Sequence, residues 1–574
     1  MVIYERVIRG RKFRIASQSV WDPRRGQAIT RQAVLGSAEP LPVVDLAQTQ
    51  VMGTKGIGDV GALIWVAEQL DLVALLDRSF ALTGRSTGPT LGEMVVAVAL
   101  QRACAPGPKT DLAAFLAGSL PRVSCLPPAA FTGQAFHRLA QQVTETDLER
   151  VQVVLARAIV ERFSLRTDVL AFDTTNFDTH IATPTAGDLA RRGHAKSKRR
   201  DLRVVGLGLL VSETEHVPLL YRTFPGNSSD QAVLRTCLEG LGKLQDALDG
   251  QGPLVATRTL VRDGGFWSPD LEEVLDLVGY SSLISLPLGH KASRLALAHA
   301  ATPRAMKRLR GRLSPSRAAR LRTKVGELDR TLVVIESQEL LEGQKRGVAA
   351  RLKKAKQELR VLERGVQKRK VDRGTLERRV KRILAKEHLA TFVVVAVKGS
   401  EKNMTLTWSV DAAKRKTLER TRLGRRVLCT DRHRWGTERI VSAAHGQWKV
   451  EELFRRSKKG AVVPWGPSHL WADSSLRLHT FATVVGLTLV SLVRVALAPE
   501  TSALRMMENL REVRTTLVRT RSGSIGRPVT VMLVPERSEE QQRFVEVFDL
   551  ARWLPALGLS PRETRAKGMK KAVS

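Results

Sequence analysis

Hydrophobic residues recur at steps of three and four positions through residues 55–165. The stretch from Val60 to Leu82 shows this pattern clearly. Similar periods run through residues 91–103, 112–120 and 136–163. Such spacing is typical of helices that are buried along one face. We therefore expect a helical domain at 55–165, preceded by a β-rich segment at 1–54.

The pattern changes after residue 165, where short apolar runs follow one another. The runs are VLAFD, LRVVGLGLLV and VPLLYRTF, then a helical stretch after Ser229, then PLVATRTLVRD and YSSLISLPL. Three hairpin-like strands followed by alternating helices and strands are typical of a mixed sheet. The predicted fold class is therefore α/β, with a mixed sheet flanked by helices.

Residues 301–390 differ from the rest of the chain in charge. They contain 27 Lys and Arg against 10 Asp and Glu, so they carry +17 of a total net charge of +36. Their apolar positions step by four and three, which predicts a coiled-coil-like seam on a basic helical hairpin. The seam residues are Val348, Leu352, Ala355, Leu359, Leu362 and Val366. The basic faces fit contact with DNA phosphates or a solvated surface, and the seam also fits pairing of two protomers.

Composition narrows the class of partner. A pI near 10.9 favours a polyanion, with nucleic acid ahead of an anionic membrane surface. The four cysteines lie far apart without a C-x-x-C spacing, so neither a disulfide framework nor a zinc finger is expected.

Two further features bear on location. The chain is charged from its fifth residue, which argues against a signal peptide. The apolar stretch Phe481 to Ala498 contains Arg494 and is shorter than a bilayer requires, so we expect a buried helix and no membrane partner.

Two aspartates follow apolar strands. Asp173 comes at the end of VLAFD, and Asp263 at the end of TLVRD. Carboxylates from neighbouring strand ends would repel each other in a shared site unless divalent cations lay between them. The alternative is that each aspartate caps a turn or a helix.

A third acid, Glu451, belongs to the amphipathic stretch WKVEELFRRSKK. On a helix Glu451, Arg455 and Lys458 share one face, because they are spaced i, i+4 and i+7. That face would hold one metal-binding acid and two phosphate-binding cations, although Glu451 and Arg455 alone also fit an ordinary surface ion pair. Three more cations are candidate DNA contacts, namely Lys196, Lys198 and Arg199.

Taken together, these motifs resemble those of bacterial insertion-sequence transposases with a DDE catalytic triad. The similarity is to the IS-four-like superfamily, which is marked by a Tyr-x2-Arg-x3-Glu-x6-Lys signature. LAFDTTNF resembles the first-Asp motif, LVRDGGF the second-Asp motif, and WKVEELFRRSK the Glu helix. PWGPSHLWADSSLRLHTF resembles the segment that usually follows the Glu helix, and the likeness extends over about residues 1 to 500.

The resemblance implies an RNase H-like catalytic domain whose metal-binding triad is Asp173, Asp263 and Glu451, with Lys458 as the signature lysine. Two positions depart from the signature, because its Tyr and Arg fall on Ala444 and Gln447. An insertion domain is implied before the Glu helix. The expected order is a first catalytic part at 166–288, an insertion at 289–430, a second catalytic part at 431–500 and a basic region at 501–574.

The resemblance also implies two Mg²⁺ (or Mn²⁺) ions, cleavage and strand transfer at the terminal inverted repeats of an insertion sequence, and insertion into target DNA. A homodimer is expected, because two DNA ends must be handled together. We expect the protein in the bacterial cytoplasm, associated with the nucleoid. The alternatives are a transposase-derived DNA-binding protein without catalysis, and an RNase H-like nuclease that cuts without joining.

Overall fold

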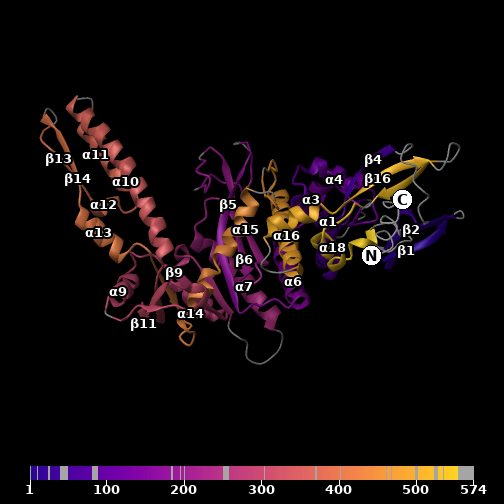
Figure 1. The fold of residues 1–574 in the computed structure, drawn as a ribbon, viewed down its shortest axis with the longest axis horizontal. Helices are drawn as coiled ribbons and strands as arrows, with labels where there is room; N and C mark the ends of the chain where they lie inside the picture. The colour runs from indigo at the N-terminus through magenta and orange to yellow at the C-terminus, as the bar shows by residue number, and fades with distance from the viewer. Residues whose placement is uncertain are drawn as a thin grey trace, which may run out of the picture. The chain divides into compact units, whose positions relative to one another are not determined.

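The computed structural model divides the chain into two compact units. Unit 1 combines Met1–Arg258 with Gln447–Ser574, and unit 2 is Thr259–Gly446. Figure 1 labels their helices and strands. The residues that the structure describes are 2–8, 11–22, 26–38, 50–80, 88–182, 185–193, 195–199, 201–249, 258–302, 304–368, 371–400, 403–459, 462–466, 468–497, 502–521, 528–533 and 535–553.

In unit 1, six helices follow the first strands and share a buried apolar core. They are α1 (Gly58–Gln69), α2 (Leu72–Phe80), α3 (Leu91–Cys104), α4 (Leu112–Gly118), α5 (Gly133–Ala140) and α6 (Glu145–Phe163). Two of them begin at capping boxes, formed by Thr90 with Glu93 in α3 and by Thr144 with Asp147 in α6. These boxes satisfy backbone N–H groups of the first turn. The helical period of residues 55–165 is thus confirmed, whereas DNA recognition by this region stays a prediction.

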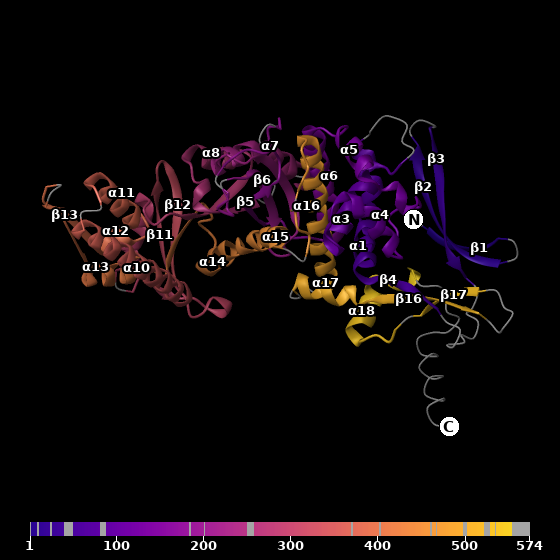
Figure 2. The same ribbon diagram turned by 90° about the horizontal axis from the view of Figure 1, so that it is seen from above.

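Helix α16 (Asp473–Leu497) is buried among these helices. It packs against α1, α3 and α5, as Figure 2 shows. Gly486 brings α16 close to α3, because a Cβ at this position would lie 3.1 Å from the Ala99 carbonyl oxygen. Among the described helices α16 alone is long and apolar enough to cross a membrane, but 89% of its most apolar window is buried inside the protein. The prediction of a buried helix here is confirmed.

Three antiparallel strands form the part of the large mixed sheet that belongs to unit 1. They are β5 (Val169–Thr179), β6 (Arg203–Ser212) and β7 (Pro218–Pro225), followed by α7 (Asp230–Asp249). The expectation that Asp173 ends its strand is wrong. Asp173 pairs with Leu209 of β6, and the pairing continues to Thr179, because the residues after Asp173 find partners all along β6. Asp173 therefore lies inside a strand.

Two smaller three-stranded sheets complete unit 1. One contains β1 (Val2–Ile8), β2 (Arg11–Asp22) and β3 (Gln27–Ser37), and the other contains β4 (Gln50–Gly56), β16 (Arg514–Arg521) and β17 (Pro528–Leu533). In the second sheet β16 lies between β17 and β4 and pairs with both. The remaining helices are α15 (Trp448–Lys459), α17 (Ala503–Arg511) and α18 (Glu539–Val547). Residues from both ends of the sequence thus share one sheet.

Unit 2 contains strands in the order β10, β11, β12, β15, β9, β8. Their bounds are β8 (Arg258–Arg262), β9 (Tyr280–Leu286), β10 (Lys307–Arg308), β11 (Arg317–Val325), β12 (Leu328–Glu336) and β15 (Arg425–Thr430). The helices around them are α8 (Pro269–Leu277), α9 (Lys291–Ala300) and α14 (Thr437–His445). Helix α8 connects β8 to β9, which are neighbours in the sheet.

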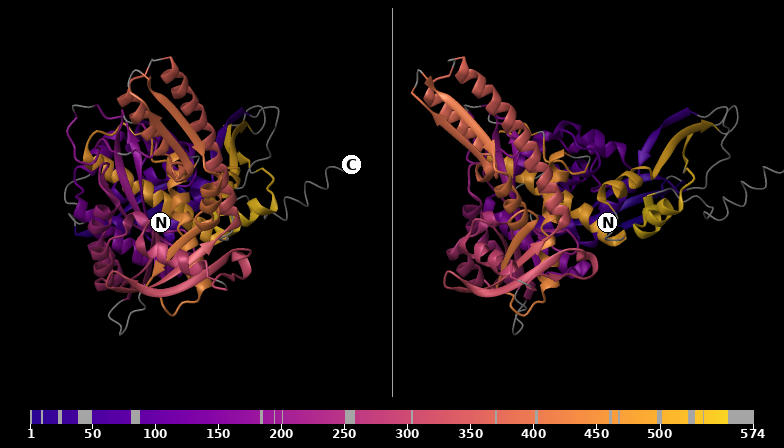
Figure 3. Two further views of the ribbon diagram at one scale, coloured as in Figure 1. Left: turned by 90° about the vertical axis from the view of Figure 1, so that its left-hand side faces the viewer. Right: turned by 60° about the vertical axis from the view of Figure 1, so that its left-hand side comes forward.

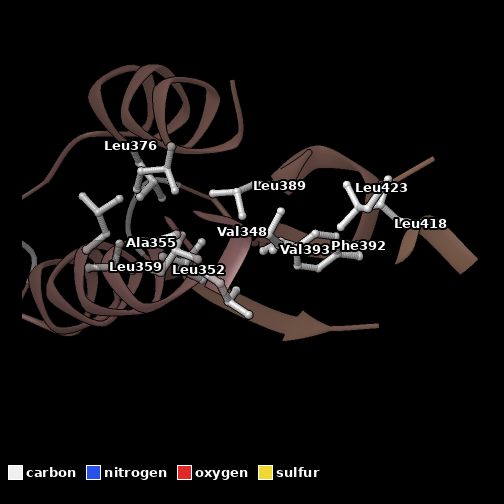
Figure 4. Packing of buried hydrophobic residues seen from close by; sticks show 14 residues of the cluster. Val348, Leu352, Ala355, Leu359, Leu376, Leu389, Phe392, Val393, Leu418 and Leu423 are labelled. Carbon is white, nitrogen blue, oxygen red and sulfur yellow. The ribbon is translucent and has the colours of Figure 1, made fainter. Parts of the chain in front are cut away.

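A separate layer of unit 2, residues 337–424, is called the arm here. It contains α10 (Gln338–Gln367), α11 (Arg373–Leu384), α12 (Leu389–Phe392), β13 (Val393–Lys398), β14 (Thr405–Val410) and α13 (Ala412–Thr421). Figure 3 shows the long α10 beside the β13–β14 hairpin, and α10 contacts β14. The arm has its own apolar core, in which all six seam residues of α10 are buried (Figure 4).

The structure corrects two expectations about residues 301–390. Residues 317–336 form the paired strands β11 and β12 and not part of a helical hairpin, because their apolar residues are buried in a sheet. The seam does not remain open for a second protomer, since it packs against residues such as Leu376, Phe392 and Leu406 of the same arm.

A buried ion pair stabilises unit 2 immediately before Asp263. The Arg262 guanidinium donates to Glu272 at 2.7 Å and to the Ser282 hydroxyl at 2.6 Å, and the side chains of Arg262 and Glu272 are both fully buried. Arg330 lies 3.6 Å from the other Glu272 oxygen. Two cations therefore face one buried carboxylate, so loss of its charge leaves buried charges without compensation.

We predict that Glu272→Gln lowers the stability of the protein by about 3–5 kcal/mol, because it breaks a buried ion pair. The neighbouring Glu273 is exposed, and Glu273→Gln should change stability by less than about 0.5 kcal/mol. Denaturant unfolding of the full chain measures both. Equal midpoints for the two variants would show that the Arg262 pair contributes little.

Candidate active site

The first candidate carboxylate lies on the β5 strand of unit 1. Asp173 is half-buried, and its Oδ1 accepts a hydrogen bond from the Thr174 N–H at 2.7 Å. Thr174 itself donates its hydroxyl to Asp230 of α7 at 2.7 Å. Because side chains alternate along a strand, Asp173 and Phe177 share one face of β5. The pairing with β6 and the hydrogen bond to α7 fix the position of β5 and of the Asp173 carboxylate.

Helix α15 carries the second carboxylate. It packs against β5 and β6 through Val450, Leu453 and Phe454, all buried, as its amphipathic pattern predicts (Figure 1). Glu451 lies in the first turn and is exposed. In the described part of the chain, Glu451 forms no hydrogen bond or ion pair with another side chain. Its carboxylate is therefore available to a ligand.

The neighbouring Glu452 has a structural role. Arg456 donates to it at 2.5 Å, and His216 Nδ1 lies 3.6 Å from its other oxygen. The interaction with His216 and the charge of Arg456 outweigh burial and lower the pKa of Glu452 to about 2. One turn earlier, Lys449 donates to the Glu213 carbonyl. These contacts fix the rotation of α15 and so determine where Glu451 points.

Lys458 lies at the other end of α15, near the strand that carries Asp173. Its Nζ is 6.0 Å from the centre of the Phe177 ring, within range of a cation–π contact. Desolvation by the surrounding protein, followed by the charge of Lys196, lowers the pKa of Lys458 to about 8, although Asp178 and Asp173 oppose this shift. The side chain still reaches solvent. It can therefore offer a proton or a positive charge to a phosphate near neutral pH.

The basic segment before β6 lies along β5. The Lys196 N–H donates to Asn176 Oδ1 at 3.0 Å, and its ammonium donates to the Thr174 carbonyl at 2.6 Å. Ser197 donates to Asp178 at 2.9 Å. Of the predicted DNA contacts, Lys196 is thus held beside the Asp173 strand, whereas the exposed Lys198 is not bonded to it within the described residues.

Two other predicted DNA contacts differ in their surroundings. Arg199 pairs with Asp201, so part of its charge is already compensated. Arg455 is exposed on α15, and it pairs with no acid in the part of the chain that the structure describes.

The segment after α15 packs against the face of β5 that carries Asp173, a role that the sequence patterns do not reveal. The fully buried Trp465 stacks on Phe177, with ring centroids 4.9 Å apart and an angle of 15° between the planes. Its indole N–H donates to Thr480 at 3.0 Å, and its carbonyl contacts His479 Nε2 at 2.8 Å. Lys109 Nζ lies 2.8 Å from the other nitrogen of His479.

The same segment is bound by Arg102, whose Nε donates to the Pro464 carbonyl at 2.7 Å. Burial lowers the pKa of Arg102 to about 10 and that of Lys109 to about 7, and it lowers the pKa of His479 well below its usual value. A hint in the sequence is that His479 and Thr480 interrupt an otherwise apolar helix. Such polar residues need buried partners.

Asp263 belongs to unit 2. It directly follows β8, as predicted, and it is exposed at the start of the short helix Gly264–Phe266 without capping it. The backbone after Asp263 approaches the strand end of β9 closely, because a Cβ on Gly264 would collide with the Ser285 carbonyl and Pro287. A glycine is therefore required directly after this carboxylate.

The three candidate carboxylates are thus divided between the units, with Asp173 and Glu451 in unit 1 and Asp263 in unit 2. Among the described residues, no group of three or more His, Cys, Asp or Glu side chains is gathered for a metal ion. Ala444 and Gln447, which replace the signature Tyr and Arg, are both buried.

One comparison with known proteins identifies the family of this chain. Residues 165–461 match the family model of the transposase DDE domain. This range includes Asp173, Asp263 and Glu451 and covers more than half of the chain, so the protein belongs to the DDE transposase domain family. No curated protein matches the chain.

Two solved transposase structures are similar to parts of the chain. One is a piggyBac transposase synaptic complex with hairpin DNA, with 9% identity, coverage of 92% of each chain and a TM-score of 0.36. The other is a Mos1 transposase paired-end complex with the left transposon end, with 12% identity, coverage of 35% of this chain and 61% of that chain, and a TM-score of 0.15. Both TM-scores lie below 0.5, so neither likeness defines the fold.

We predict that DNA affinity falls as pH rises through about 8, because Lys458 then loses its proton and its attraction to phosphate. Lys458→Arg keeps the charge and should remove most of this fall between pH 7 and 9. Lys458→Met should bind more weakly at pH 7 and show the same flat profile. Fluorescence anisotropy with labelled duplex DNA measures the effect, and an unchanged profile in Lys458→Met would exclude Lys458 as its source.

We also predict that Trp465→Ala destabilises unit 1 by about 3–5 kcal/mol, because it leaves a large cavity beside Phe177. Trp471 is a matched control, since it is 64% exposed and lies six residues away. Trp471→Ala should change stability by less than about 0.5 kcal/mol. Thermal unfolding of the full-length variants compares them, and similar midpoints would contradict the supporting role of Trp465.

Proposed function

We propose that this DDE transposase-family protein binds the ends of an insertion sequence and catalyses metal-dependent DNA cleavage and strand transfer. The observation that carries the proposal is the family match, which spans all three candidate carboxylates. The family supports a role in DNA transposition. Its IS-four-like branch and a bacterial cytoplasmic location are part of the proposal.

The donor set fits divalent metal ions. Asp173, Asp263 and Glu451 would supply carboxylate oxygens, which are the ligands that Mg²⁺ and Mn²⁺ prefer. Glu451 and Asp263 are exposed, and Asp173 is held in a rigid strand. When bound, two Mg²⁺ or Mn²⁺ ions would activate a water or 3′-hydroxyl nucleophile and stabilise the leaving oxygen. The proposal requires all three carboxylates to reach shared ions when DNA is bound.

The other residues of the site would hold the DNA backbone. Lys458 and Arg455 extend from the same helix as Glu451, and Lys196 lies beside the strand of Asp173. Their charges would attract phosphates to the carboxylates and would make binding depend strongly on salt. Lys198 and Arg199 would contact DNA farther along the same basic segment.

Recognition of the terminal inverted repeats is assigned to the helices of residues 55–165, and the working form would be a homodimer holding two ends. Target DNA would bind at the same catalytic site in the second step. Because α16 packs among these helices, a deletion of residues 1–165 would expose α16. Point substitutions on exposed surfaces of α1 to α6 therefore test recognition better than deletion does.

We predict that Asp173→Asn, Asp263→Asn and Glu451→Gln each reduce DNA cleavage by about 10³-fold or more with Mg²⁺, since several kcal/mol of charge stabilisation is lost. Binding of duplex ends should persist. Asp178→Asn is the matched control, because Asp178 is another half-buried aspartate on β5 that bonds Ser197. Calorimetric titration with Mn²⁺ gives a readout independent of catalysis, in which the triad variants should bind fewer ions.

The outcomes distinguish three functions. Loss of cleavage in the triad variants with retained strand transfer in the wild type supports a transposase. Cleavage by the wild type without joining indicates a nuclease. DNA binding without Mn²⁺ binding or cleavage indicates a transposase-derived binding protein, for which the buried Ala444 and Gln447 already provide one departure from the family signature.

A further inference from the structure

The arm carries a row of exposed cations along one side of α10. The row, called the basic stripe, consists of Arg346, Lys353, Lys356, Arg360 and Arg364. At 100° per residue these side chains project within a sector of about 80°, whose centre lies about 120° around the helix from the centre of the buried seam. Lys356 is half-buried and the other four are exposed. The fold thus presents the whole stripe to solvent.

The charge of the stripe is not compensated within the arm. Several acidic side chains of the arm are bound elsewhere, with Lys386 donating to Glu358 at 2.8 Å and Arg351 donating to Glu387 at 2.8 Å. Glu363 accepts from the Trp408 indole at 3.3 Å. In the described part of the chain, none of the five stripe residues forms an ion pair. Five neighbouring cations without ion-pair partners repel one another, and an external anion would relieve this repulsion.

The dimensions of the stripe match a duplex. From residue 346 to residue 364 the helix rises about 27 Å, which equals the length of about eight base pairs. A membrane surface fits less well, because helices that lie in a membrane interface have an apolar face next to their basic face. In α10 the apolar seam is buried in the arm's own core, so it is not available to enter a membrane beside the stripe.

We propose that the basic stripe binds the phosphate backbone of double-stranded DNA without reading its sequence. The stripe is a second DNA-binding surface that contains none of the candidate catalytic carboxylates, and it would hold flanking or target DNA. This inference rests on the proposed function in one respect, namely that DNA is the ligand. Because phosphate contacts release counterions, each of the five cations should add about 0.9 to the steepness of the salt dependence.

The test replaces all five stripe residues with glutamine in the full-length protein. The matched control variant removes the same charge from exposed positions on α11 and α13. Its substitutions are Arg379→Gln, Lys381→Gln, Arg382→Gln, Lys416→Gln and Arg420→Gln. Affinity for two 30-base-pair duplexes of unrelated sequence is measured across a range of salt. We expect the slope of log affinity against log salt to become shallower by about 4 in the stripe variant, equally for both duplexes. The control should keep a slope within about 1 of the wild type.

Equal slopes for the stripe variant and the control would overturn the proposal, as would stripe-dependent binding to anionic vesicles with an unchanged DNA slope. If the fivefold variant fails to fold, Lys353→Gln with Arg360→Gln should still reduce the slope by about 2. A variant in which each stripe Lys is replaced by Arg and each stripe Arg by Lys should keep the wild-type slope. Asp173→Asn should keep the full slope while losing cleavage, so failure of the stripe and failure of the catalytic proposal give different results.

Discussion

Continuous pairing of β5 with β6 is the constraint on which the proposed chemistry depends. A carboxylate that holds metal ions must stay within a fraction of an ångström of its working position. Asp173 meets this requirement because it lies inside a paired strand, with α15 packed against the same strand. The stack of Trp465 on Phe177 stiffens the strand further. Glu451 and Lys458 then take their positions from the helix that this strand supports.

The support for this face comes from distant parts of the sequence. Arg102 and Lys109 from the N-terminal helices bind the segment around Trp465 through a carbonyl and through His479. Among the described residues no carboxylate pairs with these groups, and burial lowers the pKa values of all three. Buried polar groups of this kind depend on hydrogen-bond acceptors and close packing, so the arrangement tolerates little movement. The N-terminal helices and the strand of Asp173 are therefore packed together as one rigid part of unit 1.

Local patterns in the sequence predict much of this fold. The helical period of residues 55–165, the amphipathic face of α15, the strand before Asp263 and the burial of α16 all depend on near neighbours, and the structure confirms them. The prediction that β5 ends at Asp173 was wrong. The strand continues because it pairs with β6, and no local pattern in the sequence encodes this pairing. The strands β11 and β12 were missed for a related reason, since high charge hides the alternation of buried residues in a sheet.

The candidate site was predictable residue by residue but not as an assembly. The acids follow recognisable motifs, whereas contacts such as Lys109 with His479 join residues 370 positions apart. Periodicity cannot reveal such contacts, because it reports only the environment of each element. Equally, the coiled-coil-like spacing of α10 indicated an apolar seam correctly but could not show that the seam is filled by the same arm.

The sheet formed by β4, β16 and β17 has a consequence for synthesis of the protein on the ribosome. Strand β4 lies at residues 50–56, and its partner β16 begins at Arg514. While translation proceeds, β4 has an unpaired edge, and the helices that follow it lack the buried α16. The nascent chain therefore cannot complete unit 1 until nearly all of it has been made. Premature termination before residue 473 would thus remove α16 as well as the C-terminal strands, and the fragment would be prone to degradation instead of competing for DNA.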